Sequence, residues 1–161
     1  SQIKNKRKKI REFSVDSANG LVQRVGMFSY SKLAQAGISA VSYLAAVAAD
    51  GRLAGSAEIA EARKMSRQMI AKVLTVLSRH GIVEGTPGPS GGYRLARKPA
   101  EITLLDVVKV FDNLDERVMC PFGPHWCGNG SSCPLHDKLA SMHQGVLDEL
   151  AAESFAQFQV K

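Results

Sequence analysis

Residues 82–96 contain two short strand-like segments on either side of a loop that is very rich in turn-forming residues. The flanking segments are 82–84 and 93–96, and the loop between them reads Gly-Thr-Pro-Gly-Pro-Ser-Gly-Gly. Glycine and proline in this number exclude a helix and favour a reversal of the chain. Two short strands around such a tip predict a β-hairpin.

Three helices are predicted ahead of this hairpin. The first covers residues 31–49 and ends at Asp50-Gly51, and the second covers 56–63 with Ser56 as its N-cap. The third begins at an N-cap, Ser66, and closes at His80-Gly81. It is amphipathic, because an apolar face of Met69, Val73 and Leu77 lies opposite a polar face of Gln68, Lys72, Thr75 and Arg79.

The order helix, turn, helix and hairpin is that of a winged helix-turn-helix, a fold that binds DNA. The charge of the same segment agrees, since residues 57–98 have eight basic and three acidic side chains. A basic stretch inside a mixed-charge chain is typical of a nucleic-acid surface, although a solvated face gives the same pattern. We therefore predict a mainly α protein with a small β-hairpin that binds double-stranded DNA.

In this fold the third helix enters the major groove and the hairpin, or wing, approaches the DNA backbone. Arginine pairs with guanine, glutamine with adenine, and lysine with phosphate. Glycines let a tip come close to DNA because they have no Cβ atom. The candidate DNA-binding residues are Ser66, Arg67, Gln68, Lys72, Ser90, Gly91, Gly92 and Arg94.

After the hairpin, Thr103 and Asp106 form a capping-box pattern that opens a helix running through Phe111. A long final helix is predicted from about Asp137 to Gln157. Its apolar stripe is wide enough to need a partner, which we expect to be a second copy of the chain. The stripe comprises Leu139, Met142, Val146, Leu147, Leu150, Ala151, Phe155 and Phe158.

Cys120, Cys127 and Cys133 are the three cysteines of the chain, and they fall within fourteen positions of a Gly/Pro-rich loop. An odd number of clustered thiols does not suit a set of structural disulfides. Thiolates on such a loop suit zinc or an iron–sulfur cluster. A fourth ligand is needed, and His136, three residues beyond Cys133, is the nearest candidate; His125 also lies in the loop.

These observations divide the chain into four parts: a basic flexible arm at 1–26, a winged helix-turn-helix domain at 27–114, a cysteine-rich loop at 115–136 and a dimerisation helix at 137–161. The arm has six basic side chains and no acidic one among its first eleven residues. We found no apolar run of membrane-span length and no signal-peptide pattern, so a cytoplasmic protein is expected. Neither a nucleophile–base pair nor a phosphate-binding loop emerges, which argues against an enzyme.

The chain resembles the IscR/NsrR-type family of winged-helix regulators (the Rrf-two family). The likeness lies in residues 66–83, 88–95, 101–108 and the cysteine loop through His136, and it covers roughly residues 28–158. It implies a homodimeric transcription factor on a palindromic operator, with the last helices crossing between subunits. It also implies one 2Fe-2S or 4Fe-4S cluster per subunit on the three cysteines, with His136 matching a Cys-x-x-His motif. The cluster state would then tune DNA affinity.

The signal that such a cluster would sense stays open between redox state, nitric oxide and iron–sulfur status. Gln35 stands where the nitric-oxide sensors of this family place a carboxylate ligand, and Ala71 stands where the iron–sulfur biogenesis regulator has a site-discriminating glutamate. Two other classes compete with a cluster-sensing regulator. One is a zinc-stabilised winged-helix protein without redox sensing, and the other is a small redox metalloprotein.

Overall fold

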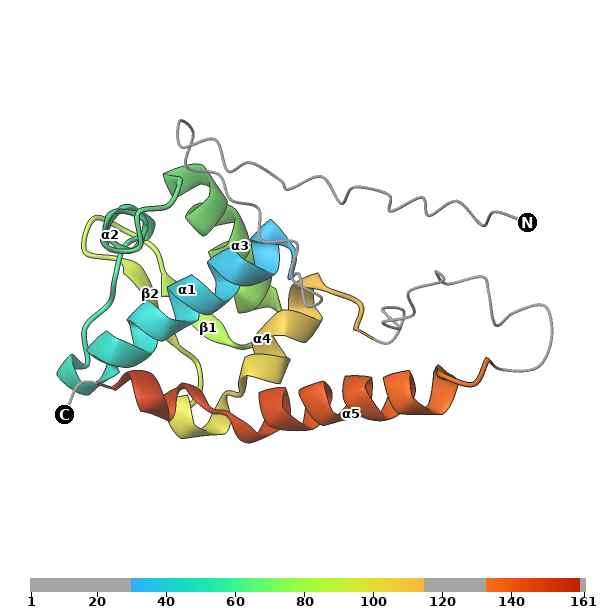
Figure 1. Cartoon of the computed structure of the whole chain (residues 1–161). Coiled ribbons are helices and arrows are strands. Elements are labelled where there is room, and N and C mark those ends of the chain that lie inside the picture. The colour runs from blue at the N-terminus through green and yellow to red at the C-terminus, as the bar shows by residue number, and fades with distance from the viewer. Residues whose placement is uncertain (1–29, 115–132, 160–161) are drawn as a thin grey trace, which may run out of the picture.

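The computed structural model describes residues 30–114 and 133–159 of the 161-residue chain. Within these ranges the protein is mostly helical and has one two-stranded antiparallel sheet (Figure 1). The elements are α1 (Lys32–Val47), η1 (Ala48–Asp50), α2 (Ser56–Ala62), α3 (Arg67–Arg79), β1 (Val83–Thr86), β2 (Gly92–Leu95), η2 (Pro99–Glu101), α4 (Leu104–Phe111), α5 (His136–Ala152) and η4 (Phe155–Phe158). The predicted arm at 1–26 and most of the predicted cysteine loop lie outside the described residues.

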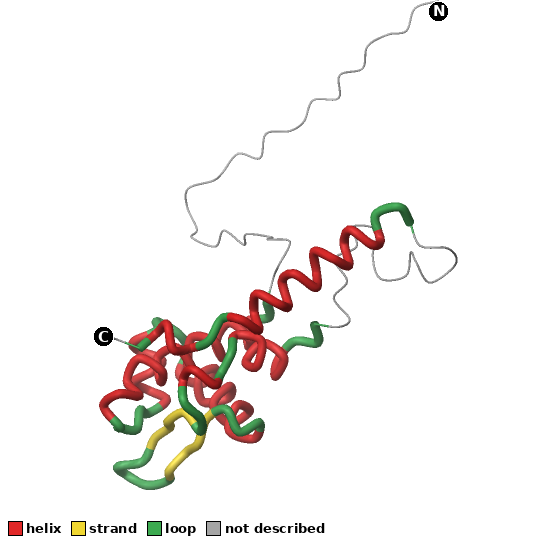
Figure 2. Tube along the Cα trace, turned by 90° about the horizontal axis from the view of Figure 1, so that it is seen from below, coloured by secondary structure: helices red, strands yellow, loops and turns green. Residues whose placement is uncertain are grey.

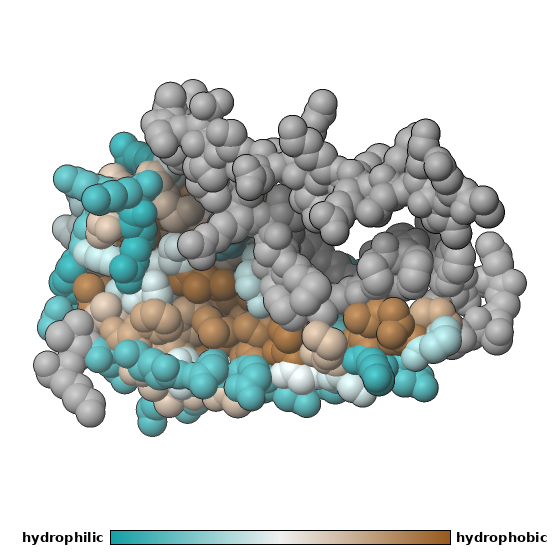
Figure 3. Space-filling view, viewed as in Figure 1, coloured by the Kyte–Doolittle hydropathy of each residue, from teal (hydrophilic) through white to brown (hydrophobic). Residues whose placement is uncertain are grey.

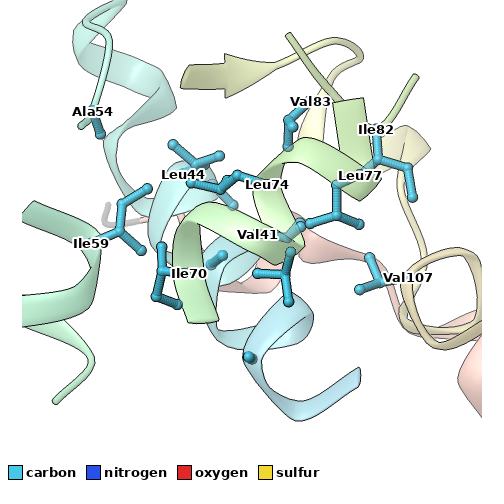
Figure 4. Close-up of a cluster of buried hydrophobic side chains, with 14 of the residues drawn as sticks. Val41, Leu44, Ala54, Ile59, Ile70, Leu74, Leu77, Ile82, Val83 and Val107 are labelled. Atoms are coloured by element: carbon cyan, nitrogen blue, oxygen red, sulfur yellow. The ribbon is translucent and has the colours of Figure 1, made fainter. Parts of the chain in front are cut away.

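Helix α1 is the central helix of the core, which explains its apolar composition. The Ser31 side chain caps it by accepting a hydrogen bond from the Ala34 N–H at 3.1 Å. The segment Lys32–Asp50 is long and apolar enough to span a membrane by composition alone. Its apolar side is instead buried against α3 and α4, where Val41 and Leu44 meet Leu74 and Leu77 of α3 (Figure 4).

Helices α2 and α3 form the predicted helix-turn-helix, with one correction at the start of α2. Gly55, not Ser56, is the N-cap, and Ser56 is the first helical residue. Ser66 is the N-cap of α3 as predicted, with its carbonyl accepting from the Ile70 N–H at 3.0 Å, but its side chain makes no capping hydrogen bond. Gly81 follows α3 in the left-handed conformation expected of a residue after a helix end (φ 66°).

The predicted hairpin is present, and each strand lies within one or two residues of its expected position. Val83 pairs with Leu95 and Thr86 pairs with Gly92, so the turn covers residues 87–91. Ala54 adds a single bridge to the free edge of β2, because the Ala54 N–H donates to the Tyr93 carbonyl at 3.0 Å and the Tyr93 N–H donates back at 2.9 Å. This bridge ties the wing to the chain just before α2.

The capping box of α4 forms as predicted. The Asp106 N–H donates to the Thr103 hydroxyl at 3.1 Å, and the Thr103 N–H donates to the Asp106 carboxylate at 3.0 Å. Helix α4 packs closely on α1 at Gly37, where a Cβ atom would lie 2.5 Å from the Phe111 ring. This contact explains why the apolar stripe of α1 includes a glycine.

The last helix is shorter than the sequence predicted. Helix α5 ends at Ala152 rather than Gln157, because the following residues turn back to pair with the segment before α4. The Leu104 N–H donates to the Glu153 carbonyl, and the Phe155 N–H donates to the Ile102 carbonyl, each at 2.9 Å. The expectation that Phe155 belongs to the exposed apolar stripe is therefore wrong, since its side chain is fully buried in the core.

Candidate nucleic-acid interface and metal ligands

The exposed face of α3 presents the predicted recognition residues to solvent. Ser66, Arg67, Gln68 and Lys72 are all exposed, while Ile70 and Val73 on the opposite face are fully buried. The amphipathic pattern of this helix thus places its polar residues at the surface of the protein. Because the Ser66 hydroxyl is not used as a helix cap, it is available to a ligand.

A groove separates α3 from the wing, and it brings three of the predicted residues together. Arg67 lines it from the start of α3, and Gly91 and Gly92 line it from the wing. No acidic side chain lines the groove among the described residues. Its other lining residues are Gly55, Ser56, Ala57, Thr75, Ser78, Arg79, Gly85, Thr86, Pro87, Gly88 and Tyr93.

Arg79 lies on the predicted polar face of α3 but was not among the predicted DNA-binding residues. It lies at the C-terminal end of α3, three turns from Arg67, and it lines the same groove. Thr75 lies between them on the same side of the helix. The spacing of residues 67, 75 and 79 indicates that they lie on one side of a helix. The sequence did not reveal that this side of α3 faces the wing.

The glycines of the wing are needed by the wing itself. A Cβ atom on Gly91 would lie 2.1 Å from the Thr86 carbonyl oxygen, and one on Gly92 would lie 3.0 Å from the Ala54 backbone. The Gly91 N–H also donates to the Gly88 carbonyl at 2.9 Å, which closes the tip. These close approaches hold the tip compact, and they leave the exposed Ser90 at its end.

Arg94 lies apart from the other predicted DNA-binding residues. It forms a hydrogen-bonded ion pair with Glu84, directly opposite it on β1. Arg94 lines a different surface recess, near the end of α1, and not the groove that contains Arg67.

A polar cluster fixes the position of α2 against α1. The Tyr43 hydroxyl and the Arg52 guanidinium each donate to Glu58 Oε1 at 2.6 Å. These hydrogen bonds lower the pKa of Glu58 below its ordinary value, with the bond from Tyr43 the largest cause. Arg63 completes the cluster by lying 5.5 Å from the centre of the Tyr43 ring.

The predicted metal ligands are only partly within the described residues. Cys120, Cys127 and the further candidate His125 lie outside them, whereas Cys133 and His136 lie at the start of α5. Both described side chains are partly exposed, and the His136 N–H donates to the Cys133 carbonyl at 3.0 Å, so they share one turn. In the part of the chain that the structure describes, no three metal-ligating side chains gather at one point.

Comparisons with known proteins identify the family. Residues 30–160 match the model of the Rrf2 family, described as iron-dependent transcriptional regulators. A protein of Aquifex aeolicus (strain VF5) named "Putative HTH-type transcriptional regulator" is 34% identical over 99 residues, which are 60% of this chain and 69% of that protein.

Solved structures show the same fold at lower identity. CymR (YrzC), the global cysteine regulator of B. subtilis, superposes with a TM-score of 0.71 at 18% identity, covering 83% of this chain and 99% of CymR. IscR of T. potens has a TM-score of 0.63 at 21% identity, covering 80% and 84%. The chain belongs to the Rrf2 family and is a winged-helix, DNA-binding transcriptional regulator rather than an enzyme.

Proposed function

We propose that this regulator binds a palindromic DNA operator as a homodimer, with α3 in the major groove and the wing in the adjacent minor groove. The observation that carries this proposal is the groove between α3 and the wing, which Arg67 and Arg79 line without an acidic neighbour among the described residues. One sugar–phosphate strand separates a major groove from the next minor groove. A protein that fills both grooves needs a basic channel for that strand, and this groove provides one.

Within this interface the residues take different roles. Arg67 and Gln68, at the start of α3, are proposed to read base edges, because their side chains match guanine and adenine. Lys72 and Ser66 are proposed to contact phosphate. Ser90, Gly91 and Gly92 bring the wing tip to the minor groove.

These roles are tested by measuring the affinity of each variant for a duplex that the wild-type protein selects from a random library and for a scrambled duplex. Arg67→Ala and Gln68→Ala should each weaken binding to the selected duplex by about 1–3 kcal/mol and leave binding to a scrambled duplex nearly unchanged. Lys72→Ala should weaken both about equally. Lys109→Ala, at an exposed position on α4, is the control. Unchanged affinity of Arg67→Ala and Gln68→Ala for the selected duplex would reject the assignment.

The proposed dimer rests on α5. None of its side chains is buried in the described part of the chain, and Met142 is 48% exposed. The helix extends away from the winged-helix body (Figure 2), and an apolar band runs along it and onto the body (Figure 3). At Gly145, the described residues place no atom within 4 Å of an added Cβ. A second α5 covering this face would bury the stripe and set two recognition helices on one operator.

We further propose that Cys120, Cys127, Cys133 and His136 hold one iron–sulfur cluster per subunit, of the 2Fe-2S or 4Fe-4S type. Cys133 and His136 fit this set, since they share one turn and are both accessible at the N-terminus of α5. The positive end of the helix dipole there favours anionic thiolates. Loss or change of the cluster, in response to redox state, nitric oxide or iron–sulfur status, would then alter operator affinity in the cytoplasm.

Zinc is the competing occupant, because thiolates bind both kinds of centre. Anaerobic purification followed by a visible spectrum and by iron, sulfide and zinc assays separates the two. The proposal predicts a coloured protein with iron and sulfide, which serine at any one of the three cysteines abolishes. His136→Ala should change the spectrum or the lifetime of the cluster, while His143→Ala, two turns along the same helix, should not. Stoichiometric zinc without sulfide would reject cluster sensing.

A further inference from the structure

A second basic surface lies outside the α3 groove, at the base of the wing. It is a recess between the end of α1, the following loop, β2 and η2. Four of its lining side chains are cationic and, among the described residues, none is acidic. The cationic ones are Arg52, Arg94, Arg97 and Lys98.

Three of these cations are held in place by the protein. Glu58 accepts a hydrogen bond from Arg52 at 2.6 Å, Glu84 pairs with Arg94, and the Glu101 carbonyl accepts from Arg97 at 3.3 Å. A guanidinium has five N–H donors, so one or two bonds orient it and leave donors for an anion. Pre-orientation lowers the entropy that binding would cost.

Strand β2 contributes to both basic surfaces, at successive positions along its length. Gly92 and Tyr93 line the α3 groove, whereas the next two residues, Arg94 and Leu95, line the recess. Positive charge therefore borders β2 both near the tip, in the α3 groove, and near the base, in the recess. A minor groove is itself bordered by two phosphate strands, about 6 Å apart.

We propose that the recess binds the phosphate strand on the far side of the minor groove that the wing enters, so that the wing is clamped between two DNA backbones. This inference rests on the proposed placement of α3 and the wing, and it extends the DNA footprint beyond the major-groove contacts. Phosphate competes here with Glu58 and Glu84 for the arginines. Both ion pairs are exposed, with side chains 38–59% accessible, and exposed ion pairs are worth little.

The salt dependence of binding to a fluorescein-labelled 40-base-pair duplex of mixed sequence tests the inference. Each phosphate contact contributes about 0.9 to the slope of log affinity against log salt. Arg97→Gln/Lys98→Gln should reduce the slope by about 2 per bound subunit, so that the affinity lost between 50 and 200 mM salt becomes about tenfold smaller for each bound subunit. Lys109→Gln/Lys138→Gln removes the same charge from exposed sites on α4 and α5 and should leave the slope unchanged.

A third variant, Lys72→Gln/Arg79→Gln, removes two exposed cations of α3 that are expected to contact phosphate, and it separates this inference from the proposed function. If it lowers the slope while Arg97→Gln/Lys98→Gln behaves like the lysine control, the far-side contact is refuted and the α3 groove stands. If neither arginine-containing variant lowers the slope, the proposed DNA interface fails as well. All variants change exposed side chains, and circular dichroism spectra matching the wild type would establish that they fold.

Discussion

Replacing Phe155 tests whether the chain after α5 is part of the winged-helix core. The Phe155 ring is fully buried, and the backbone N–H of Phe155 donates a hydrogen bond to the Ile102 carbonyl. Phe158, three residues later, is 42% exposed and touches Phe155 with ring centres 5.5 Å apart. The two phenylalanines thus form a matched pair on η4, one inside and one at the surface.

Removing a buried phenylalanine ring costs about 3–5 kcal/mol, which combines lost burial with the cavity left behind. Phe158→Ala should cost about 1 kcal/mol, since roughly half of the ring is already in water. A folded domain is typically stable by about 5–15 kcal/mol, so Phe155→Ala removes a large share of the total. For a chain of this size the midpoint of thermal unfolding should fall by roughly 10 °C.

Thermal and urea unfolding of both variants, followed by circular dichroism, measure this difference. The measurements need one fixed protein concentration, because the apparent stability of a dimer depends on concentration. If Phe155→Ala unfolds no more easily than Phe158→Ala, the terminal segment does not stabilise the core and the packing described above is wrong.

Three other changes have defined outcomes. Leu150→Asp and Gly145→Leu on α5 should give folded monomers by light scattering, because none of the described residues packs on Gly145; a persistent dimer would place the interface elsewhere. Gly91→Ala should distort the wing and weaken DNA binding, since its Cβ would meet the Thr86 carbonyl. Gly51→Asn is the control, because Gly51 lies in open space at φ 65°, a conformation that asparagine tolerates. Equal DNA binding by the two variants would contradict this prediction. Glu58→Gln should lower stability at neutral pH relative to wild type, and the difference should vanish as the pH falls from the ordinary carboxyl pKa through the lowered folded one; a difference that persists in acid would show that the charge of Glu58 is not its cause.

Local sequence signals predicted most of the fold. Three features depend on only a few neighbouring residues and can be predicted from the local sequence. They are the capping box of Thr103 and Asp106, the left-handed Gly81 and the chain reversal at residues 87–91. The amphipathic pattern of α3 likewise predicted which of its side chains face water. The family resemblance was also confirmed, over nearly the residues expected.

The errors arose where distant segments meet. Periodicity alone extended α5 to Gln157, but the backbone after Ala152 pairs with the segment before α4, which no local signal announces. The ion pair of Arg94 with Glu84 was likewise not foreseen, because it depends on the register of the two strands; the DNA contact of Arg94 stays a prediction. The sequence did not single out Arg79, because the side of α3 that faces the wing is fixed by packing and not by the sequence of the helix.

The central claim, that an iron–sulfur cluster controls DNA binding, is tested by operator affinity with and without the cluster. The same selected duplex is titrated anaerobically with cluster-loaded protein and with protein from which iron and sulfide have been removed. Coupling between two sites is typically about 1–3 kcal/mol, so the dissociation constants should differ by about 5- to 150-fold. Cys133→Ser protein should bind with the affinity of the cluster-free form. Equal affinity of the two wild-type preparations would contradict cluster control, even if the winged helix binds DNA as described.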